Sequence, residues 1–325
     1  GAEFASVANN ADPDYWQRLG YTVQGSWGIC EIAWLQSHGF LTAGRKVINQ
    51  PDIVTWALAG HEVASDTSHS LKSGFDLDNL VWPRKIFDAL HVSATFLPHV
   101  AVAGEIIGEV SPTASAKAGL PVGCKIVAGM TDGCAAQISA GALSAGDWNS
   151  VLGTTLVLKG ASKTRLRDTT GSVYARRAPF NAGWWPGGAS STGASAINRW
   201  LEGAAREELK FNRTQLKNSP IFYPLAGQGE RFPFVSASAE AFAVQGVFPS
   251  VAEHGIEITF AAIAKGLAFV ERLCFDLLDL IGYQIDGNVS FTGGGANNAD
   301  WSQLRSTVLG VQVAVPTAKE GAIGM

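Results

Sequence analysis

The chain has 325 residues, of which 46% are hydrophobic and 16% are charged, and it contains 37 glycines. Such a composition indicates a globular protein with layered, mostly buried structure and many tight turns. The length is sufficient for two domains, because a single core stops growing before roughly 300 residues. The formal net charge is -4 and Lys and Arg form no basic stripe, which argues against nucleic acid as a partner.

Cysteine spacing and hydropathy argue against a zinc protein, a disulfide-rich protein and a membrane protein. The four cysteines lie far apart, without the CxxC spacing typical of a zinc site and without the pattern of a disulfide framework. The longest apolar run, 256–280, is interrupted by charged residues, so no stretch is apolar over the roughly 20 residues of a membrane span. We therefore expect a cytoplasmic protein without a membrane partner, and we assign no metal-ligating residue.

Hydrophobic periodicity and turn residues predict alternating helices and strands along the first part of the chain. We expect helices over 29–38, 51–59, 82–90, 111–119 and 133–143, and strands over 104–110 and 121–127. The Ser- and Thr-rich segment 62–75 has no period, so we expect a surface loop. Residues 66–69 within it either contact a polyhydroxylated ligand or, as is commoner for such residues, form turns.

The second part of the chain begins with a predicted hairpin of strands over 149–152 and 156–159. Helices are predicted over 192–202 and 257–283, the latter with a buried stripe that includes Leu273 and Leu280. A strand over 288–292, a glycine-rich turn, a helix over 300–309 and a strand over 311–315 follow. Segment 184–188 is expected to be an apolar loop, and Glu230 and Arg231 suggest an internal ion pair. A last helix is expected to begin at Glu320.

Three features point to a site. Asp132 follows a predicted strand, and ligand sites in α/β sheets favour the carboxyl ends of strands. It is a candidate general base, the alternative being that it caps the next helix. Gly153, Thr154 and Thr155 form a hairpin turn that would direct N–H groups and hydroxyls at an anion. The three glycines at 293–295 lie between a strand and a helix, an arrangement that brings backbone close to phosphate or purine.

Two turns of this kind, each between a strand and another element, are typical of an actin-like ATP site. The alternatives are weaker. A dinucleotide fingerprint that starts at Gly293 would need a glycine where Asn298 stands, and no Walker loop occurs in the chain.

The order of four blocks resembles the FGGY carbohydrate kinases, with the xylulokinase branch looking closest. The blocks are LPVGCKIVAGMTDGCAAQISAGAL at 120–143, SVLGTTLVL at 150–158, YPLAGQGERFPF at 223–234 and FTGGGANNADWSQLRSTVLGVQVAVPTAKEGAIG at 291–324. The resemblance implies an α/β protein with the actin-like ATPase fold, in which two ribonuclease-H-like lobes enclose the active site in the cleft between them. Residues 1–144 would be the remainder of the N-terminal, sugar-binding lobe, and residues 145–325 the C-terminal, ATP-binding lobe.

The resemblance also assigns roles to single residues. Asp132 would be the catalytic base. Gly153, Thr154 and Thr155 would form the phosphate turn, with Gly193 in the same pocket, and Gly294, Gly295 and Asn298 would bind the nucleotide. ATP and Mg²⁺ would be the cofactors.

The chain departs from the family pattern in three places. Met130 and Thr131 replace the usual glycine-rich setting of the base. The Asp-x-Gly-Thr loop that opens the family's chains is absent, and the similar run 168–171 has no strand before it. Since the chain also stops at Met325, we expect it to be incomplete at both ends.

The resulting hypothesis is ATP-dependent phosphorylation of a sugar hydroxyl, with a pentulose such as xylulose as substrate. Alternatives are a non-catalytic binder of nucleotide or sugar, an inactive kinase fragment, and an actin-like ATPase that no sugar stimulates. The oligomeric state, including a homodimer, is left open, as is the identity of the sugar.

Overall fold

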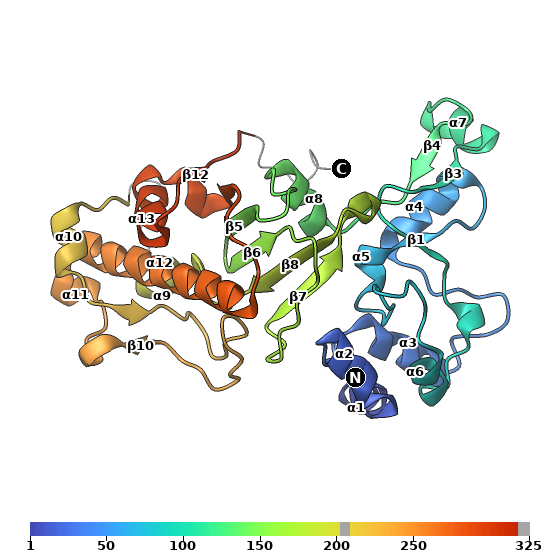
Figure 1. Ribbon diagram of the computed structural model, residues 1–325, viewed down its shortest axis with the longest axis horizontal. Helices are drawn as coiled ribbons and strands as arrows, with labels where there is room; N and C mark the ends of the chain where they lie inside the picture. Colours follow the sequence, from blue (N-terminus) through green and yellow to red (C-terminus); the bar gives the residue numbers. More distant parts are fainter. Residues whose placement is uncertain (202–208, 318–325) are drawn as a thin grey trace. The chain divides into compact units, whose positions relative to one another are not determined.

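The computed structural model describes residues 1–201 and 209–317. The chain divides into two compact units, one made of residues 1–135 and 176–184 and the other of residues 136–175 and 185–324 (Figure 1). The division after Ala135 lies near the boundary expected at residue 144, and the assignment of 1–144 and 145–325 to two lobes stays a prediction.

Helices dominate the start of the first unit. The predicted helix 29–38 is confirmed as α3, and it packs with three other helices around Trp16, Ile29 and Phe87. The Trp16 indole also donates a hydrogen bond to the carbonyl of Ala8 over 2.7 Å, which joins the first two helices. The four helices are α1 (Ala2–Ala11), α2 (Pro13–Leu19), α3 (Gly28–Ser37) and α6 (Arg84–Ala89).

A second, smaller core in the first unit lies between α4 (Gln50–Ala59), α7 (Pro112–Ala118) and a two-stranded antiparallel sheet. The sheet pairs β3 (Ile106–Glu109) with β4 (Lys125–Val127). Ser111 caps α7 by accepting a hydrogen bond from the Ala114 N–H, as its sequence predicts. The strand before Asp132 therefore belongs to a small sheet, which weakens the argument that placed this residue at the carboxyl end of a strand in a wide α/β sheet.

The segment 62–75 is not the surface loop that its composition suggested. It contains β1 (Ser65–Asp66), which pairs in parallel with β2 (Val100–Ala101), and α5 (Thr67–Ser70). Asp66, Thr67 and Ser68 are buried. Asp66 accepts hydrogen bonds from the N–H groups of Ser68 and His69, so these short polar residues satisfy one another locally and tolerate burial. The short η1 (Ala94–Phe96) precedes β2.

A six-stranded sheet forms the centre of the second unit, in the order β12-β11-β5-β6-β8-β7. The predicted hairpin is confirmed as antiparallel β5 and β6, while β11 runs parallel to both β5 and β12. The strands are β5 (Trp148–Leu152), β6 (Leu156–Gly160), β7 (Val173–Arg177), β8 (Trp184–Ala189), β11 (Val289–Thr292) and β12 (Val313–Ala314).

Strand β8 replaces the apolar loop expected at 184–188. Gly188 pairs with Leu158 of β6, and a Cβ at Gly188 would lie 2.7 Å from the ring of Phe232. Two glycines in a row made this segment look like a turn. Gly188 instead allows a buried aromatic ring to pack directly on the strand, and a Cβ at Gly187 would lie 2.7 Å from the carbonyl oxygen of Leu158.

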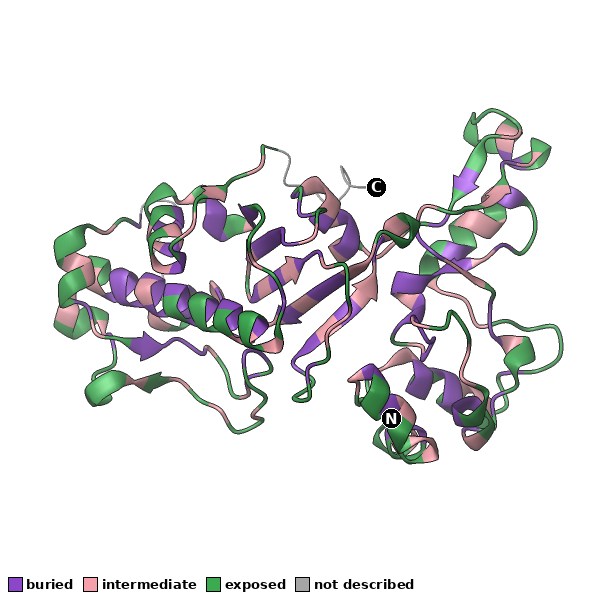
Figure 2. Ribbon diagram, viewed as in Figure 1, coloured by how far each residue is buried: buried purple, intermediate pink, exposed green. Residues whose placement is uncertain are grey.

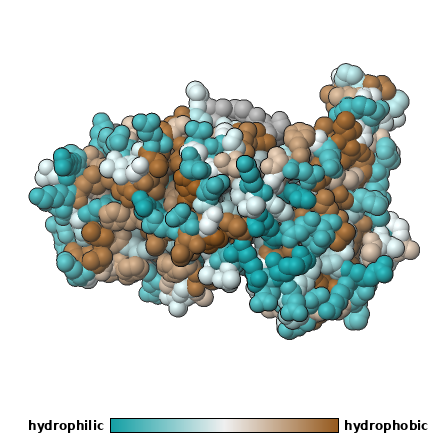
Figure 3. Space-filling model, in the orientation of Figure 1, coloured by the Kyte–Doolittle hydropathy of each residue, from teal (hydrophilic) through white to brown (hydrophobic). Residues whose placement is uncertain are grey.

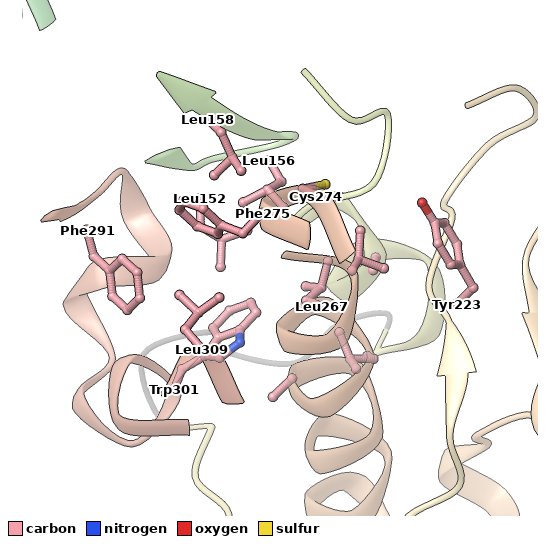
Figure 4. Close-up of a cluster of buried hydrophobic side chains, with 14 of the residues drawn as sticks. Leu152, Leu156, Leu158, Tyr223, Leu267, Cys274, Phe275, Phe291, Trp301 and Leu309 are labelled. Carbon is pink, nitrogen blue, oxygen red and sulfur yellow. The ribbon is translucent and has the colours of Figure 1, made fainter. Parts of the chain in front are cut away.

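The long helix α12 (Ile256–Ile281) is confirmed, and it packs with α13 (Ala299–Leu309) to cover the core shown in Figure 4. The expected stripe was partly wrong, because Leu273 and Leu280 are 46% and 83% exposed. Phe260, Cys274 and Leu278 are buried instead, and Figure 2 shows the buried and exposed faces of this helix. Figure 3 shows that hydrophobic side chains remain interspersed with hydrophilic ones on the viewed surface.

A buried ion pair joins the two covering helices. Arg305 of α13 and Glu271 of α12 are each 1% exposed, and two guanidinium nitrogens donate to the carboxylate over 2.7 and 2.8 Å. Arg305 also donates to the hydroxyl of Ser150 on β5, and its guanidinium lies 3.7 Å from the ring centroid of Phe291 on β11. The pair therefore ties both helices to the neighbouring strands β5 and β11.

The remaining elements are short. The predicted helix 192–202 is seen over six residues as α9, and its expected end at Glu202 lies outside the described residues, as does the helix expected from Glu320. Across the described ranges, no helix combines the length and hydropathy needed to span a membrane. The short elements are α8 (Asp132–Ser139), η2 (Pro179–Asn181), α9 (Ser195–Trp200), α10 (Arg213–Asn218), β9 (Phe222–Tyr223), β10 (Phe242–Ala243), η4 (Val244–Gly246), α11 (Val251–His254) and η5 (Gly294–Asn297).

Candidate active site

A cavity of about 460 Å³ opens in the second unit, at the ends of β5 and β11. Five of the residues singled out from the sequence line it: Gly153, Thr154, Gly294, Gly295 and Asn298. The remaining wall consists of Leu152, Ala194, Ser195, Ile197, Asn198, Phe260, Asn297 and Trp301. The fold thus gathers two glycine-containing turns, separated by about 140 positions in the sequence, around one space.

Thr155 belongs to the turn and Gly193 packs against it, but neither residue lines the cavity. The N–H of Gly153 donates to the carbonyl of Thr155 over 3.0 Å, which closes the turn between β5 and β6. A Cβ at Gly193 would lie 2.4 Å from the Cα of Thr155, so only glycine permits this approach. Both residues therefore shape the turn, whereas Gly153 and Thr154 face the cavity.

Each of the three consecutive glycines, 293–295, lacks a side chain for a different physical reason. Gly293 adopts a φ of +79°, and a Cβ there would lie 2.6 Å from the carbonyl oxygen of Leu152. A Cβ at Gly295 would lie 2.5 Å from the side chain of Leu152. At Gly294 a Cβ would meet nothing within 4 Å, so the absence of a side chain there leaves backbone open to the cavity.

Asn298 caps α13, since its side-chain oxygen accepts from the N–H of Trp301 over 2.9 Å. Its amide group donates to the carbonyl of Leu209, so both ends of the side chain are engaged within the protein. Asn298 therefore shapes the cavity wall through the start of α13.

The sequence analysis missed an apolar wall of the cavity. Phe260 of α12 and Trp301 of α13 meet edge to face, with ring centroids 5.7 Å apart. The indole N–H of Trp301 is buried and has no hydrogen-bond partner among the described residues. Helix periodicity predicts the helix over 300–309, but it does not distinguish an aromatic ring that lines a cavity from one that is buried in the core.

Asp132 lies in the first unit, at the start of α8, and is exposed. One carboxylate oxygen accepts from the N–H of Gly133 over 2.6 Å. Thr131 precedes it and accepts, through its carbonyl, the first hydrogen bonds of the helix from Cys134 and Ala135. The local contact with Gly133 therefore agrees with a role at the helix start, and the exposed carboxylate also remains accessible to a substrate.

A buried network supports the loop that carries Asp132. The N–H of Thr131 donates to the hydroxyl of Ser68 over 2.8 Å, and that hydroxyl donates to Asp66 over 2.6 Å. The other oxygen of Asp66 lies 2.6 Å from Nδ1 of His69. The loop that carries Asp132 is thus joined to α5, which is part of the segment expected to be a surface loop.

The network also sets charge states. The hydrogen bond that His69 donates to Asp66 raises the pKa of His69 more than burial lowers it, and the charges of Asp52 and Asp132 raise it further. Burial alone would raise the pKa of Asp66, but hydrogen bonds from His69 and Ser68 outweigh it and hold that pKa below its usual value. The pair of ionised Asp66 and protonated His69 is therefore favoured in the pH range between the lowered pKa of Asp66 and the raised pKa of His69.

The expected ion pair between Glu230 and Arg231 is not formed. The carboxylate of Glu230 instead accepts hydrogen bonds from hydroxyls and backbone N–H groups, and the Arg231 Nε donates to the carbonyl of Ala189. Within the described ranges, no group of three or more His, Cys, Asp or Glu is arranged to hold a metal ion.

Two family models match most of the chain. The model described as "FGGY family of carbohydrate kinases, N-terminal domain" matches residues 7–139, and the corresponding C-terminal domain matches residues 148–325.

Individual relatives are more distant. "Xylulose kinase" of Bacillus subtilis is 23% identical over 269 residues, which cover 81% of this chain and 53% of the relative. "L-xylulose/3-keto-L-gulonate kinase" of Escherichia coli is 24% identical over 302 residues, covering 89% of this chain and 58% of the relative. The chain thus spans little more than half the length of these curated relatives.

Among solved structures, the "xyloylose kinase" from Brucella ovis superposes with a TM-score of 0.84 at 23% identity, over 99% of this chain and 68% of that one. This likeness confirms the predicted fold class, an α/β protein with the actin-like ATPase fold. Because the C-terminal model alone matches more than half of the chain, the chain belongs to the FGGY family of carbohydrate kinases.

Proposed function

We propose that the protein transfers the γ-phosphoryl group of ATP to a hydroxyl of a sugar, with a pentulose such as xylulose as substrate. The observation that carries the proposal is the convergence of both glycine-containing turns on one cavity in a member of a carbohydrate kinase family. The cavity's volume of about 460 Å³ is within the range of small-molecule sites.

The cavity's chemistry suits a nucleotide. Phe260, Ile197 and Trp301 offer apolar surface for the base, and the buried indole N–H of Trp301 is a spare donor. In this proposal the phosphates lie against Gly153, Thr154 and Gly294, and at the two glycines the backbone has no Cβ to interfere with their approach. The conformation of these turns is maintained by Gly193, Thr155, Gly295 and Asn298.

Asp132 acts as general base in the proposed reaction. It accepts the proton of the sugar hydroxyl while that oxygen attacks the γ-phosphorus, the bond from that phosphorus to the bridging oxygen breaks, and ADP leaves. Bound Mg²⁺ would supply neutralisation of the phosphate charge. The exposed carboxylate of Asp132 has no salt bridge among the described residues that would tie up its charge.

The network of Ser68, Asp66 and His69 holds the base's loop in the proposed mechanism. Thr131, next to Asp132, is fixed by its hydrogen bond to Ser68, and ionised Asp66 fixes Ser68 in turn. The nearby charge of Asp132 contributes to the raised pKa of His69, after the larger effect of the hydrogen bond to Asp66.

The choice of sugar rests on the two relatives described above, both of which are kinases of xylulose by name. The replacement of the usual glycine-rich setting by Met130 and Thr131 supports a narrowed or altered preference among pentuloses. Both enantiomers of xylulose are therefore candidates.

The test is a measurement of sugar-dependent ADP formation by the full product of the gene that encodes this chain. D-xylulose, L-xylulose, D-ribulose and glycerol are each supplied with ATP and Mg²⁺, and ATP alone is the control. We expect one pentulose to give the highest kcat/KM. ADP formation that no sugar stimulates would refute the proposal and favour an actin-like ATPase, while nucleotide binding without turnover would favour a non-catalytic binder.

A further inference from the structure

Glu230 is a buried carboxylate surrounded by donors rather than by cations. It is 3% exposed and accepts six hydrogen bonds, none of them from a basic side chain. One oxygen accepts from the hydroxyls of Ser190, Thr192 and Tyr223 over 2.9, 2.8 and 2.8 Å. The other accepts from backbone N–H groups of Ser191, Arg231 and Phe232 over 2.6, 2.9 and 3.5 Å.

Ionisation of Glu230 is maintained by these donors. Burial alone would raise its pKa, but the N–H groups of Ser191 and Arg231 and the hydroxyls of Tyr223 and Thr192 outweigh burial and hold the pKa below its usual value. Figure 4 shows Tyr223 with its hydroxyl oxygen in red. Burial, followed by the charge of Glu230, raises the pKa of that phenol, so Tyr223 stays protonated and keeps donating.

Three of the six donors come from consecutive residues, Ser190 to Thr192, which join β8 to α9. This segment is itself bonded to the turn that lines the cavity. Ser190 donates its N–H to the carbonyl of Leu156 over 2.9 Å, and Leu156 donates to the carbonyl of Thr192 over 2.8 Å. Glu230 therefore fixes both residues that pair with the strand immediately after the turn.

The same segment continues into direct contact with the turn. Ala194 donates its N–H to the carbonyl of Gly153 over 2.9 Å, and Ser195 donates to the carbonyl of Thr154 over 3.2 Å. Between them and Thr192 lies Gly193, whose missing side chain allows the contact with Thr155. These bonds occupy the carbonyl groups of the turn, which helps to keep carbonyl oxygens away from bound phosphate.

We propose that Glu230 is a positioning residue for the phosphate turn: it holds residues 190–192, and through them the backbone of Gly153 and Thr154, in the conformation that binds phosphate. The inference rests on the proposed function, in that it takes the cavity to be a nucleotide site. Glu230 itself is not among the residues that line the cavity, and its hydrogen bonds reach the turn through residues 190–192. Its effect is therefore specific to the phosphate part of the nucleotide.

The test compares adenosine with ADP in calorimetric titrations of wild-type protein and the Glu230→Gln variant. Glutamine keeps the size of the side chain but presents an NH₂ group to donors, so the network cannot be satisfied as before. We expect affinity for ADP to fall roughly 10- to 100-fold, as for a misplaced binding group, while affinity for adenosine stays at the wild-type value. The matched control is Glu240→Gln, an exposed glutamate in the same part of the chain, which should bind both ligands as wild type does.

A folded Glu230→Gln variant with wild-type affinity for ADP would overturn the inference, as would equal losses for adenosine and ADP, which would indicate a general structural role. If the variant does not fold, Tyr223→Phe removes a single donor and should lower ADP affinity less but in the same direction. Unchanged affinity for ADP in that variant would contradict the inference.

Hydrogen exchange separates this inference from the proposed function. Even if the wild-type protein binds neither adenosine nor ADP, the amides of Leu156, Ala194 and Ser195 should exchange faster in Glu230→Gln, whereas that of Phe291 on β11 should not change. Absence of nucleotide binding would then refute the proposed function alone. Wild-type exchange at all of these amides would refute the positioning role.

Discussion

The substitution Gly294→Ala tests the cavity assignment without disturbing the fold. A Cβ at this position meets no protein atom within 4 Å, and its φ is not in the left-handed region. We therefore expect the free energy of unfolding to stay the same or rise by about 0.4–1 kcal/mol, because alanine restricts the unfolded chain. The added methyl group would instead occupy cavity space where phosphate is proposed to approach backbone.

The neighbouring substitution Gly293→Ala provides the contrast. There a Cβ would lie 2.6 Å from the carbonyl oxygen of Leu152, on a backbone with a φ of +79°. The left-handed conformation costs about 1–2 kcal/mol and overpacking typically costs about 1–3 kcal/mol more, so a loss of roughly 2–5 kcal/mol is expected.

Urea unfolding and calorimetric titration with ADP measure the two effects separately. Gly294→Ala should lose roughly tenfold or more in ADP affinity, equivalent to about 1.4 kcal/mol, at unchanged stability. Gly293→Ala should lose stability. If Gly294→Ala bound ADP as tightly as wild type, the proposal that phosphate approaches this backbone would be refuted.

Two further predictions concern stability. Arg305→Leu should lower the free energy of unfolding by about 3–5 kcal/mol, because it leaves Glu271 buried without its cation. Adding Glu271→Leu should recover part of that loss. Urea unfolding measures both variants, and a single variant as stable as wild type would contradict this prediction. The hydrogen bond to Asp66 raises the pKa of His69, so its stabilising contribution is fully present below the unfolded pKa of about 6.5 and is lost as pH rises through the folded pKa. The difference in free energy of unfolding between wild type and His69→Asn should therefore shrink as pH rises through the folded pKa of His69, in unfolding experiments between about pH 5 and 9. A difference that does not depend on pH would argue against the pair of His69 and Asp66.

The glycines of the cavity were predictable because glycine next to a strand usually marks a tight turn or a close approach of backbone. At Gly293 the left-handed backbone and the contact with Leu152 require the absence of a side chain, and Gly153 marks a tight hairpin turn. Local chemistry of this kind is visible in a sequence. The apolar wall of Phe260 and Trp301 was not, since it arises from two helices that meet only in the fold.

Burial of polar residues was harder to predict than the helices and strands themselves. Asp66 and Glu230 occur in segments without periodicity, and such segments usually lie on the surface. Asp66 is satisfied by donors from the adjacent residues 68 and 69, whereas three of the donors to Glu230 come from residues 190–192. Both arrangements depend on the folded backbone and not on composition. The helix α12 was found easily, but its nearly continuous apolar sequence left the orientation of Leu273 and Leu280 undetermined.

Phosphorylation of a sugar with Asp132 as the base is the reaction that we propose for this protein. The most direct measurement is the initial rate at which the ³²P of γ-labelled ATP enters sugar phosphate, using the full gene product and D-xylulose or whichever pentulose is turned over fastest. We compare wild type with Asp132→Asn and with Asp88→Asn, an exposed aspartate of the same unit. We predict that Asp132→Asn lowers this initial rate roughly 10²- to 10⁴-fold, which is the contribution expected of a general base, and that Asp88→Asn keeps the wild-type rate. Labelled sugar phosphate formed at the wild-type rate by Asp132→Asn would contradict this prediction.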